Sequence, residues 1–183
     1  MDRRQLKTRD SIFRAFGSLM EKKRFEHITV QEIAEKANIG RSTFYAHFET
    51  KDDLLRAMCG DIFHHVFAEK LPTETESAFP HSKSLETKLG HILYHLRENP
   101  LNLKGLLASE SGELFMHYFK GCLRDLFSHY LSEFRVDVPI DFLIHHLVGS
   151  FAETVYWWVR KDMSAPPESV AAYYLSVIRK DPQ

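Results

Sequence analysis

Cysteine is scarce in this chain of 183 residues: only Cys59 and Cys122 are present, far apart and without the spacing of a metal site. We expect both thiols to be reduced and partly buried, behaving as small apolar side chains. Long apolar runs are also missing, since none approaches the roughly 20 residues of a membrane span. The first ten residues, MDRRQLKTRD, lack the apolar stretch of a signal peptide. We therefore expect a soluble, cytoplasmic protein with no membrane partner.

Catalytic signatures are missing as well. The segment GRSTF at 40–44 lacks the second glycine of a nucleophile elbow. The sequence has no phosphate-binding glycine loop and no dinucleotide fingerprint. Asp52 and Asp53 stand side by side at a predicted helix start, where negative charge is favoured by the helix dipole. We therefore predict no enzymatic activity, no catalytic residue and no cofactor.

Neither sign of charge dominates, since the net charge is −1. The charges are nevertheless distributed unevenly along the chain. Residues 1–60 carry +3, from 12 Lys and Arg against 9 Asp and Glu, and residues 61–183 carry −4. Basic residues are densest at the N-terminus, at Arg3, Arg4, Lys7 and Arg9. Such a segment either contacts phosphates or forms a solvated helix start. The acidic remainder argues against DNA wrapping around the whole protein.

Hydrophobic periodicity predicts an all-α protein of about nine helices. Ile12, Ala15, Phe16 and Leu19 form one apolar face at helical spacing, and no strand pattern with a period of two persists. The predicted helices cover about 6–23, 29–37, 41–48, 52–70, 83–98, 101–108, 113–134, 139–161 and 166–179, with a loop at 71–82. We expect an N-terminal three-helix domain at 1–50 and a C-terminal helical bundle at 51–183.

Residues 29–54, TVQEIAEKANIGRSTFYAHFETKDDL, predict a helix-turn-helix. Thr29 is a good N-cap, and Glu32 completes a capping box. Asn38 tolerates the left-handed conformation that ends a helix. The next helix offers Arg, Ser, Thr, Tyr and His outward and two phenylalanines inward, as a helix that enters the major groove requires. The sequence therefore predicts a DNA-binding protein.

Residues 12–54 resemble the DNA-binding domain of the TetR, or tetracycline-repressor-like, family of transcriptional regulators. The matching pattern is Thr29-Val30-x-x-Ile33-Ala34-x-x-Ala37, then Ser42-Thr43-Phe44-Tyr45-x-His47-Phe48-x-x-Lys51-x-x-Leu54. The chain departs from the family at Asn38 and at 24–26, where glycine is common. The segment 157–169 is similar to a branch of the family with short C-terminal domains.

This resemblance implies which residues contact DNA. They are Thr29, Arg41, Ser42, Thr43, Tyr45, His47 and Lys51. The three residues at 41–43 would face base edges, with a phosphate contact as the alternative for Arg41. Tyr45, His47 and Lys51 would contact phosphates, and Thr29 would bring its hydroxyl and backbone to the DNA backbone. The alternatives are a place at the edge of the core for Tyr45 and a capping or packing contact for His47.

Two C-terminal helices are apolar around most of their circumference. Such a helix is either central in its own domain or shared with a partner. We predict a homodimer, which suits a palindromic operator, with simple core packing as the alternative. The predicted interface residues are Phe142, Val148, Phe151, Val155, Tyr174 and Ile178.

The resemblance further implies a ligand pocket among the C-terminal helices. An inducer bound there would favour the state that does not bind DNA. The candidate pocket residues are Tyr94, His95, Phe115, Phe119 and Phe151, although aromatics at helical spacing more often form core. The predicted function is a sequence-specific repressor of a double-stranded DNA operator, released by an unknown small-molecule effector. Control by a metal ion or a protein partner, and activation instead of repression, are the alternatives.

His91 and His95 are four residues apart, a spacing that can hold zinc on a helix. No His-Glu-x-x-His motif or cysteine pair accompanies them. Adjacent histidines elsewhere, at 64–65 and 145–146, point in different directions on a helix. We therefore predict structural or exposed histidines and no metal site.

Overall fold

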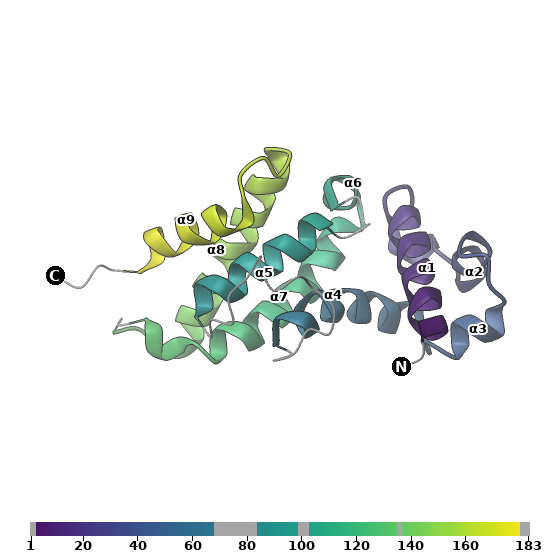
Figure 1. Ribbon diagram of the computed structural model, residues 1–183, viewed down its shortest axis with the longest axis horizontal. Helices are drawn as coiled ribbons and strands as arrows, with labels where there is room; N and C mark the ends of the chain where they lie inside the picture. Colours follow the sequence, from purple (N-terminus) through teal and green to yellow (C-terminus); the bar gives the residue numbers. More distant parts are fainter. Residues whose placement is uncertain (1–2, 68–83, 99–102, 135–136, 180–183) are drawn as a thin grey trace. The chain divides into compact units, whose positions relative to one another are not determined.

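The protein is described by a computed structural model that covers residues 3–67, 84–98, 103–134 and 137–179, with the side chains of 62–67 left aside (Figure 1). Within these ranges the chain forms nine α-helices, two short 3-10 turns and no strand, which confirms the all-α prediction. The elements are α1 (Arg3–Met20), η1 (Phe25–His27), α2 (Val30–Lys36), α3 (Arg41–Tyr45), α4 (Lys51–Phe67), α5 (Leu85–Glu98), α6 (Leu103–Ala108), α7 (Gly112–Ser128), η2 (Leu131–Glu133), α8 (Ile140–Arg160) and α9 (Pro167–Ile178). The predicted loop at 71–82 lies outside the described residues.

Helix α7 stops earlier than the predicted end at residue 134. Two side chains near its end hydrogen-bond to backbone carbonyls: the Ser128 hydroxyl donates to the Arg124 carbonyl at 2.8 Å, and His129 Nδ1 lies 2.7 Å from the Asp125 carbonyl. The following amides bond to the third carbonyl back instead of the fourth, which tightens the helix into a turn. The apolar pattern continues past Ser128, and it therefore predicted too long a helix.

Contacts within the chain divide it into two compact units. One comprises Met1–Gly60 with Asn99–Tyr118, and the other comprises Asp61–Glu98 with Phe119–Gln183. Helices α4 and α7 each run through one of these divisions. The domain boundaries predicted from the sequence, 1–50 and 51–183, stay a prediction.

The first unit is built on α1, which packs against α2 and α6, while α2 packs against α3 (Figure 1). Its apolar faces follow the periodicity of the sequence, and their side chains are withdrawn from solvent. The core residues include Ile12, Phe16, Met20, Ile28, Ile33, Phe44, Leu54 and Leu55. Complete burial of a large apolar side chain contributes about 1.5–3 kcal/mol, so this core holds α3 at a fixed angle.

The second unit pairs α5 with α9 and α8 with α9. The corner between α8 and α9 is set by Trp158, a fully buried residue whose indole N–H donates to the Ala165 carbonyl at 2.8 Å. Asp162 and Met163 adopt the left-handed conformation there, with φ of 53° and 52°. Among the residues described, no helix combines the length and apolar character needed to cross a membrane.

Candidate nucleic-acid interface

The start of α2 is held by the predicted capping box. The Thr29 hydroxyl oxygen accepts from the Glu32 backbone N–H at 3.2 Å, and the Glu32 carboxylate accepts from the Thr29 N–H at 3.0 Å. Lys23 forms an ion pair with the same carboxylate. The hydrogen bond from Lys23, followed by those from the Thr29 backbone and hydroxyl, lowers the pKa of Glu32 to about 2, because each favours the charged form. Thr29 itself is exposed to solvent.

The turn between α2 and α3 takes the conformation that its sequence predicts. Asn38 is left-handed, with φ of 54°, a conformation that asparagine tolerates better than most residues. The Ser11 hydroxyl of α1 donates to the Ala37 carbonyl at 3.0 Å, which satisfies one of the open carbonyls at the end of α2. Gly40 then forms the extended N-cap of α3, without a side-chain hydrogen bond.

Helix α3 exposes its polar residues and buries its aromatic ones. Phe44 is completely buried and Phe48 is 5% exposed, with their ring centroids 5.9 Å apart. Tyr45 is 51% exposed, and its ring meets the buried Phe44 ring edge-on with a centroid distance of 5.6 Å. Its phosphate contact and a place at the edge of the core both stay predictions. Arg41 and Ser42 are exposed, and Thr43 and His47 are half-buried. The structure thus brings together at one surface the side chains predicted to read bases and to contact phosphates along α3.

Lys51 turns its side chain into the protein. Its ammonium donates to the carbonyls of Phe25 at 2.7 Å, Glu26 at 3.0 Å and Ile28 at 3.0 Å. It also lies 4.5 Å from the centroid of the Phe25 ring, a cation–π distance. A lysine ammonium has three hydrogens, and each has a carbonyl acceptor here. The phosphate contact of Lys51 stays a prediction, and in this structure its donors are engaged within the protein.

The basic N-terminal residues lie in α1, which begins at Arg3, and the segment is therefore a helix start and not an extended arm. The Arg9 guanidinium lies over the rings of Phe13 and Phe48, 4.9 and 5.2 Å from their centroids. This stacking places one cation beside the aromatic residue that supports α3.

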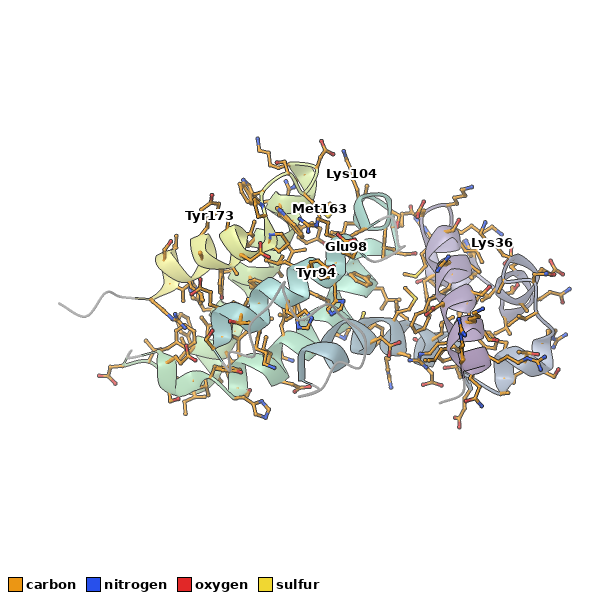
Figure 2. The ribbon with its side chains drawn as sticks, viewed as in Figure 1. Lys36, Tyr94, Glu98, Lys104, Met163 and Tyr173 are labelled. Atoms are coloured by element: carbon orange, nitrogen blue, oxygen red, sulfur yellow. The ribbon has the colours of Figure 1, made fainter. Side chains whose placement is uncertain are left out.

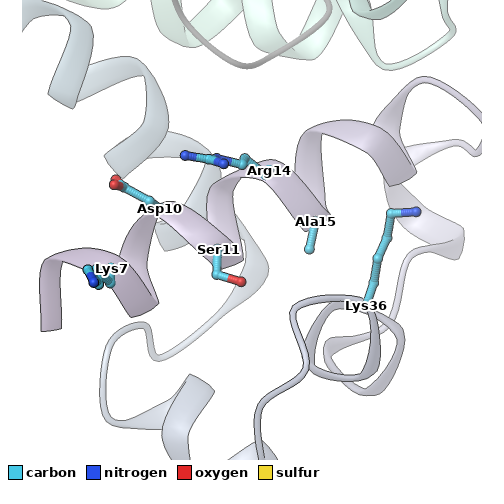
Figure 3. Close-up of a pocket in the computed structure, with 6 residues that line it drawn as sticks. All are labelled: Lys7, Asp10, Ser11, Arg14, Ala15 and Lys36. Carbon is cyan, nitrogen blue, oxygen red and sulfur yellow. The ribbon is translucent and has the colours of Figure 1, made fainter. Parts of the chain in front are cut away.

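A hollow between α1 and α2 has a volume of about 340 Å³. Figure 3 shows five of its lining residues along α1, with Lys36 reaching up from α2. Its lining residues are Lys7, Asp10, Ser11, Arg14, Ala15 and Lys36. The hollow is charged and open, and none of the predicted effector-binding residues lines it.

Residues after α6 contribute to the first unit. The Arg24 guanidinium forms a two-point ion pair with the Glu110 carboxylate, with Nη2 2.7 Å from Oε1. The hydrogen bond from Arg24 lowers the pKa of Glu110, and the same contact raises the pKa of Arg24. Next to this pair, the Ser111 hydroxyl donates to the Lys23 carbonyl at 3.1 Å. The segment between α1 and η1 is therefore in contact with the residues that precede α7.

The predicted effector-binding residues are largely core. Phe115, Phe119 and Phe151 are 1%, 0% and 0% exposed, whereas Tyr94 and His95 are half-buried. Phe115 belongs to the first unit, while the other two phenylalanines belong to the second. The structure thus does not gather the five around one described cavity, and their role in ligand binding stays a prediction.

His91 and His95 contact each other on α5. Their Nε2 atoms are 2.9 Å apart, so one ring donates a hydrogen and the other accepts it. His91 is 8% exposed. No cluster of three or more metal-ligating side chains occurs in the part of the chain that the structure describes.

Four of the six predicted dimer-interface residues are buried within the protomer. Val148, Phe151, Val155 and Tyr174 are at most 4% exposed. Phe151 and Tyr174 pack together with a centroid distance of 5.0 Å, and the Tyr174 hydroxyl donates to the Leu147 carbonyl at 2.8 Å. Burial raises the pKa of the Tyr174 phenol. In the protomer these four side chains form part of the core, and their assignment to a dimer interface stays a prediction.

The exposed apolar residues of α8 and α9 lie on other faces of these helices. Phe142, from the predicted set, is 59% exposed, and Ile178 is half-buried. Trp157 is 45% exposed, and Tyr173 and Val177 are 56% and 83% exposed. Figure 2 shows Tyr173 projecting outward from α9. Tyr173 and Val177 are four residues apart on one face of α9, a spacing that could have identified them from the sequence.

Two other contacts within the first unit had no local signal in the sequence. The pairing of Arg24 with Glu110 joins positions 86 residues apart. The Tyr118 hydroxyl donates to the Asp52 carboxylate at 3.3 Å, across 66 residues. Only the folded chain brings these groups together.

Comparison with known proteins agrees with this geometry. A family model of bacterial regulatory proteins, the tetR family, matches residues 12–58, and a model of a transcriptional regulator C-terminal region matches residues 83–180. A TetR transcriptional regulator from Streptococcus agalactiae has a similar structure, with a TM-score of 0.67 and 35% identity over 98% of this chain and 97% of that one.

Two curated relatives are similar over parts of their length. YxbF of Bacillus subtilis, an uncharacterised HTH-type transcriptional regulator, is 28% identical over 97% of this chain and 46% of its own length. DhaS of Lactococcus lactis, a dhaKLM operon transcriptional activator, is 28% identical over 61% of this chain and 54% of its own length. The chain thus spans about half the length of each of these two relatives. The chain belongs to the TetR family of bacterial transcriptional regulators and has a DNA-binding N-terminal domain.

Proposed function

We propose that the protein is a homodimeric repressor that binds a palindromic operator through α3 and leaves it when a small-molecule effector binds the C-terminal helices. The exposed polar surface of α3 carries this proposal. Arg41, Ser42 and Tyr45 are exposed while Phe44 and Phe48 anchor the helix from behind. A short helix with this division has side chains free to enter the major groove.

Each polar residue of the α3 surface has a proposed role. Arg41 reads guanine with two hydrogen bonds, and Ser42 and Thr43 contact neighbouring base edges. Tyr45 and His47 donate to phosphates, and the exposed Thr29 contacts the DNA backbone at the start of α2. Phosphate contacts fix the register of the protein on DNA, and base contacts supply the sequence preference.

The proposed dimer uses the exposed apolar faces of α8 and α9. Phe142, Trp157, Tyr173 and Val177 supply apolar area that a second copy would cover. Gly149 on α8 is half-exposed, and a Cβ added to it would meet nothing within 4 Å in the protomer. A partner helix can therefore approach closely there. Two copies related by a twofold axis would present two α3 helices to the two halves of a palindrome.

Activation is the second candidate, because the relative DhaS is an activator of the dhaKLM operon. A metal ion or a protein partner remains the alternative to a small-molecule effector. We assign no catalytic role to any residue.

Selection from a random pool of duplex DNA tests the proposal. The purified protein should enrich a palindrome, and Arg41→Ala should weaken binding and relax the preference at one position by about 1–3 kcal/mol. Arg160→Ala is the matched control, since Arg160 is exposed at the end of α8. A pool with no enriched motif, bound equally by Arg41→Ala, would contradict the proposal.

A transcription assay on the enriched operator then separates the two candidates. Repression requires that added protein lowers transcript yield from a promoter overlapping the palindrome. An increase in yield supports activation instead.

A further inference from the structure

We propose that Lys51 is a positioning residue for DNA recognition: its ammonium ties the corner before α2 to the first turn of α4 and does not donate to a phosphate. The inference rests on the proposed function, because it concerns how the DNA-reading helices are held. It assigns to Lys51 a role different from the one that the sequence predicts.

The geometry of the ammonium carries the first step. Three carbonyls converge on Lys51 Nζ at 2.7–3.0 Å, from Phe25, Glu26 and Ile28. Lysine has three donors and no acceptor, and a fourth, phosphate partner would require one of these bonds to break. The side chain is half-buried, and its contacts with the Phe25 and Ile28 carbonyls are partly buried.

The backbone at 25–28 presents carbonyl groups that favour a nearby cation. Residues 25–27 form a 3-10 turn, whose closing bond runs from the Ile28 N–H to the Phe25 carbonyl at 3.1 Å. The carbonyls at the end of a helical turn carry partial negative charge. Lys51 places its positive charge against this end, and the buried Phe25 ring lies 4.5 Å beneath it.

The position of this corner explains why it matters for DNA. Ile28 immediately precedes Thr29, the N-cap of α2, and α2 packs directly against α3. Lys51 is the first residue of α4 and follows α3 by six residues. The hydrogen bonds from Lys51 to the carbonyls at 25–28 therefore join the two ends of the chain segment that contains α2 and α3. Releasing it would let both helices shift relative to α4, which would misplace the base-reading side chains.

The two roles differ in their dependence on salt. Loss of one phosphate contact reduces the slope of log affinity against log salt by about 0.9, and it weakens all DNA sequences alike. Loss of a positioning residue leaves this slope unchanged and selectively weakens the operator. A displaced two-point base contact costs about tenfold or more in affinity.

The experiment measures the affinity of the full chain for the palindrome that it enriches and for a scrambled duplex, at several salt concentrations. Lys51→Met keeps the apolar stem over Phe25 and removes the charge. We expect operator affinity to fall about tenfold, the ratio of operator to scrambled affinity to fall with it, and the salt slope to stay constant. Lys22→Met, which removes an exposed lysine near the same corner, should leave the ratio unchanged.

A second variant keeps the inference falsifiable if Lys51→Met folds poorly. Phe25→Leu removes the ring under the ammonium without changing any charge. We then measure the operator-to-scrambled affinity ratio in a double-mutant cycle of Phe25→Leu and Lys51→Arg. The effects of the two substitutions on this ratio should be coupled and not additive, because both weaken the contact between residue 51 and the segment 25–28. A phosphate contact by Lys51 predicts additive effects.

The outcomes are distinct. A slope reduced by about 0.9 with an unchanged affinity ratio would overturn the inference in favour of a phosphate contact. Unchanged affinity in Lys51→Met would also overturn it. If the unaltered protein enriches no sequence, the proposed function fails first and the inference fails with it.

Discussion

Arg24 and Glu110 form a two-point ion pair between the segment before α2 and the residues that precede α7, with Nη2 2.7 Å from Oε1. Arg24 stands directly before Phe25, the residue under the Lys51 ammonium. The DNA-binding part of the chain is therefore tied to residues 86 positions away by a contact exposed to solvent. Both side chains are more than half exposed, so the contact orients the segment more than it stabilises the fold.

Reversing one charge of this pair should lower the melting temperature, and reversing both should restore it. Glu110→Arg places two guanidinium groups together, whereas Arg24→Glu with Glu110→Arg recreates an attractive pair. We expect shifts of a few degrees at most, smaller at high salt, because the contact is exposed. Thermal melting at low and high salt measures this. A double reversal that melts no higher than the single one would contradict the pairing.

Two helical glycines should respond oppositely to alanine. At Gly112, an added Cβ would lie 2.8 Å from the Leu106 carbonyl oxygen and 2.9 Å from the Leu107 Cα. These are backbone atoms that cannot rotate away, so Gly112→Ala should destabilise the protein by about 1–3 kcal/mol.

Gly60, inside α4, is the matched comparison. A Cβ there would meet nothing within 4 Å, so Gly60→Ala should stabilise the protein by up to about 1 kcal/mol through helix propensity. Urea unfolding of both variants checks the pair. A lower urea midpoint for Gly60→Ala than for the unaltered protein would contradict this expectation.

Glu32 should make the protein acid-sensitive. Its pKa is lowered from 4.5 to about 2 in the folded protein, first by the hydrogen bond from Lys23 and then by those from Thr29. A folded-state pKa below the unfolded value contributes stability above about pH 4.5, and this contribution is lost as the pH falls towards about 2. In Glu32→Gln, the melting temperature should therefore fall less over this window.

Glu35→Gln controls for the loss of a negative charge on the same helix. The Glu35 carboxylate lies on the exposed side of α2, where it accepts a hydrogen bond from the Gln31 side chain at 2.8 Å. Melting curves of both variants across the acid range decide the case. If both substitutions reduce the acid-induced fall in melting temperature equally, the acid sensitivity comes from net charge and not from the capping box.

The parts of the site that the sequence predicted are local in the chain. The capping box joins Thr29 to Glu32, three residues on, and Asn38 adopts its left-handed conformation within a single turn. Both depend on chemistry that neighbouring residues supply, so one sequence suffices. The division of α3 into exposed polar residues and buried Phe44 follows from helical periodicity in the same way.

The parts that it missed depend on which faces meet after folding. Composition showed that α8 and α9 are apolar on most sides, but not which side packs inward. Phe151 and Tyr174 join Phe127 in one aromatic cluster of the second unit, with centroid distances of 5.0–6.3 Å. Because the Tyr174 face of α9 packs into this cluster, the face with Tyr173 and Val177 is exposed to solvent. The adjacent tryptophans divide likewise, with Trp158 buried and Trp157 exposed.

Charge on the exposed face of α9 should separate the proposed dimer and weaken DNA binding with it. Val177 is 83% exposed, and Val177→Lys removes apolar area without disturbing the protomer core. In the proposed interface, a buried lysine would lack a partner charge, so the dimer dissociation constant should rise about tenfold or more. Sedimentation velocity over a range of concentrations measures this.

Glu168→Lys adds positive charge on the opposite side of the same helix, nine residues earlier, at an exposed position. It should leave dimerisation unchanged. Because a palindrome is read by two copies, Val177→Lys should also lower operator affinity at concentrations where the protein is monomeric, and raising the concentration should recover it. A Val177→Lys protein that dimerises as well as Glu168→Lys would place the interface on another surface and would leave the role of α3 in reading DNA untouched.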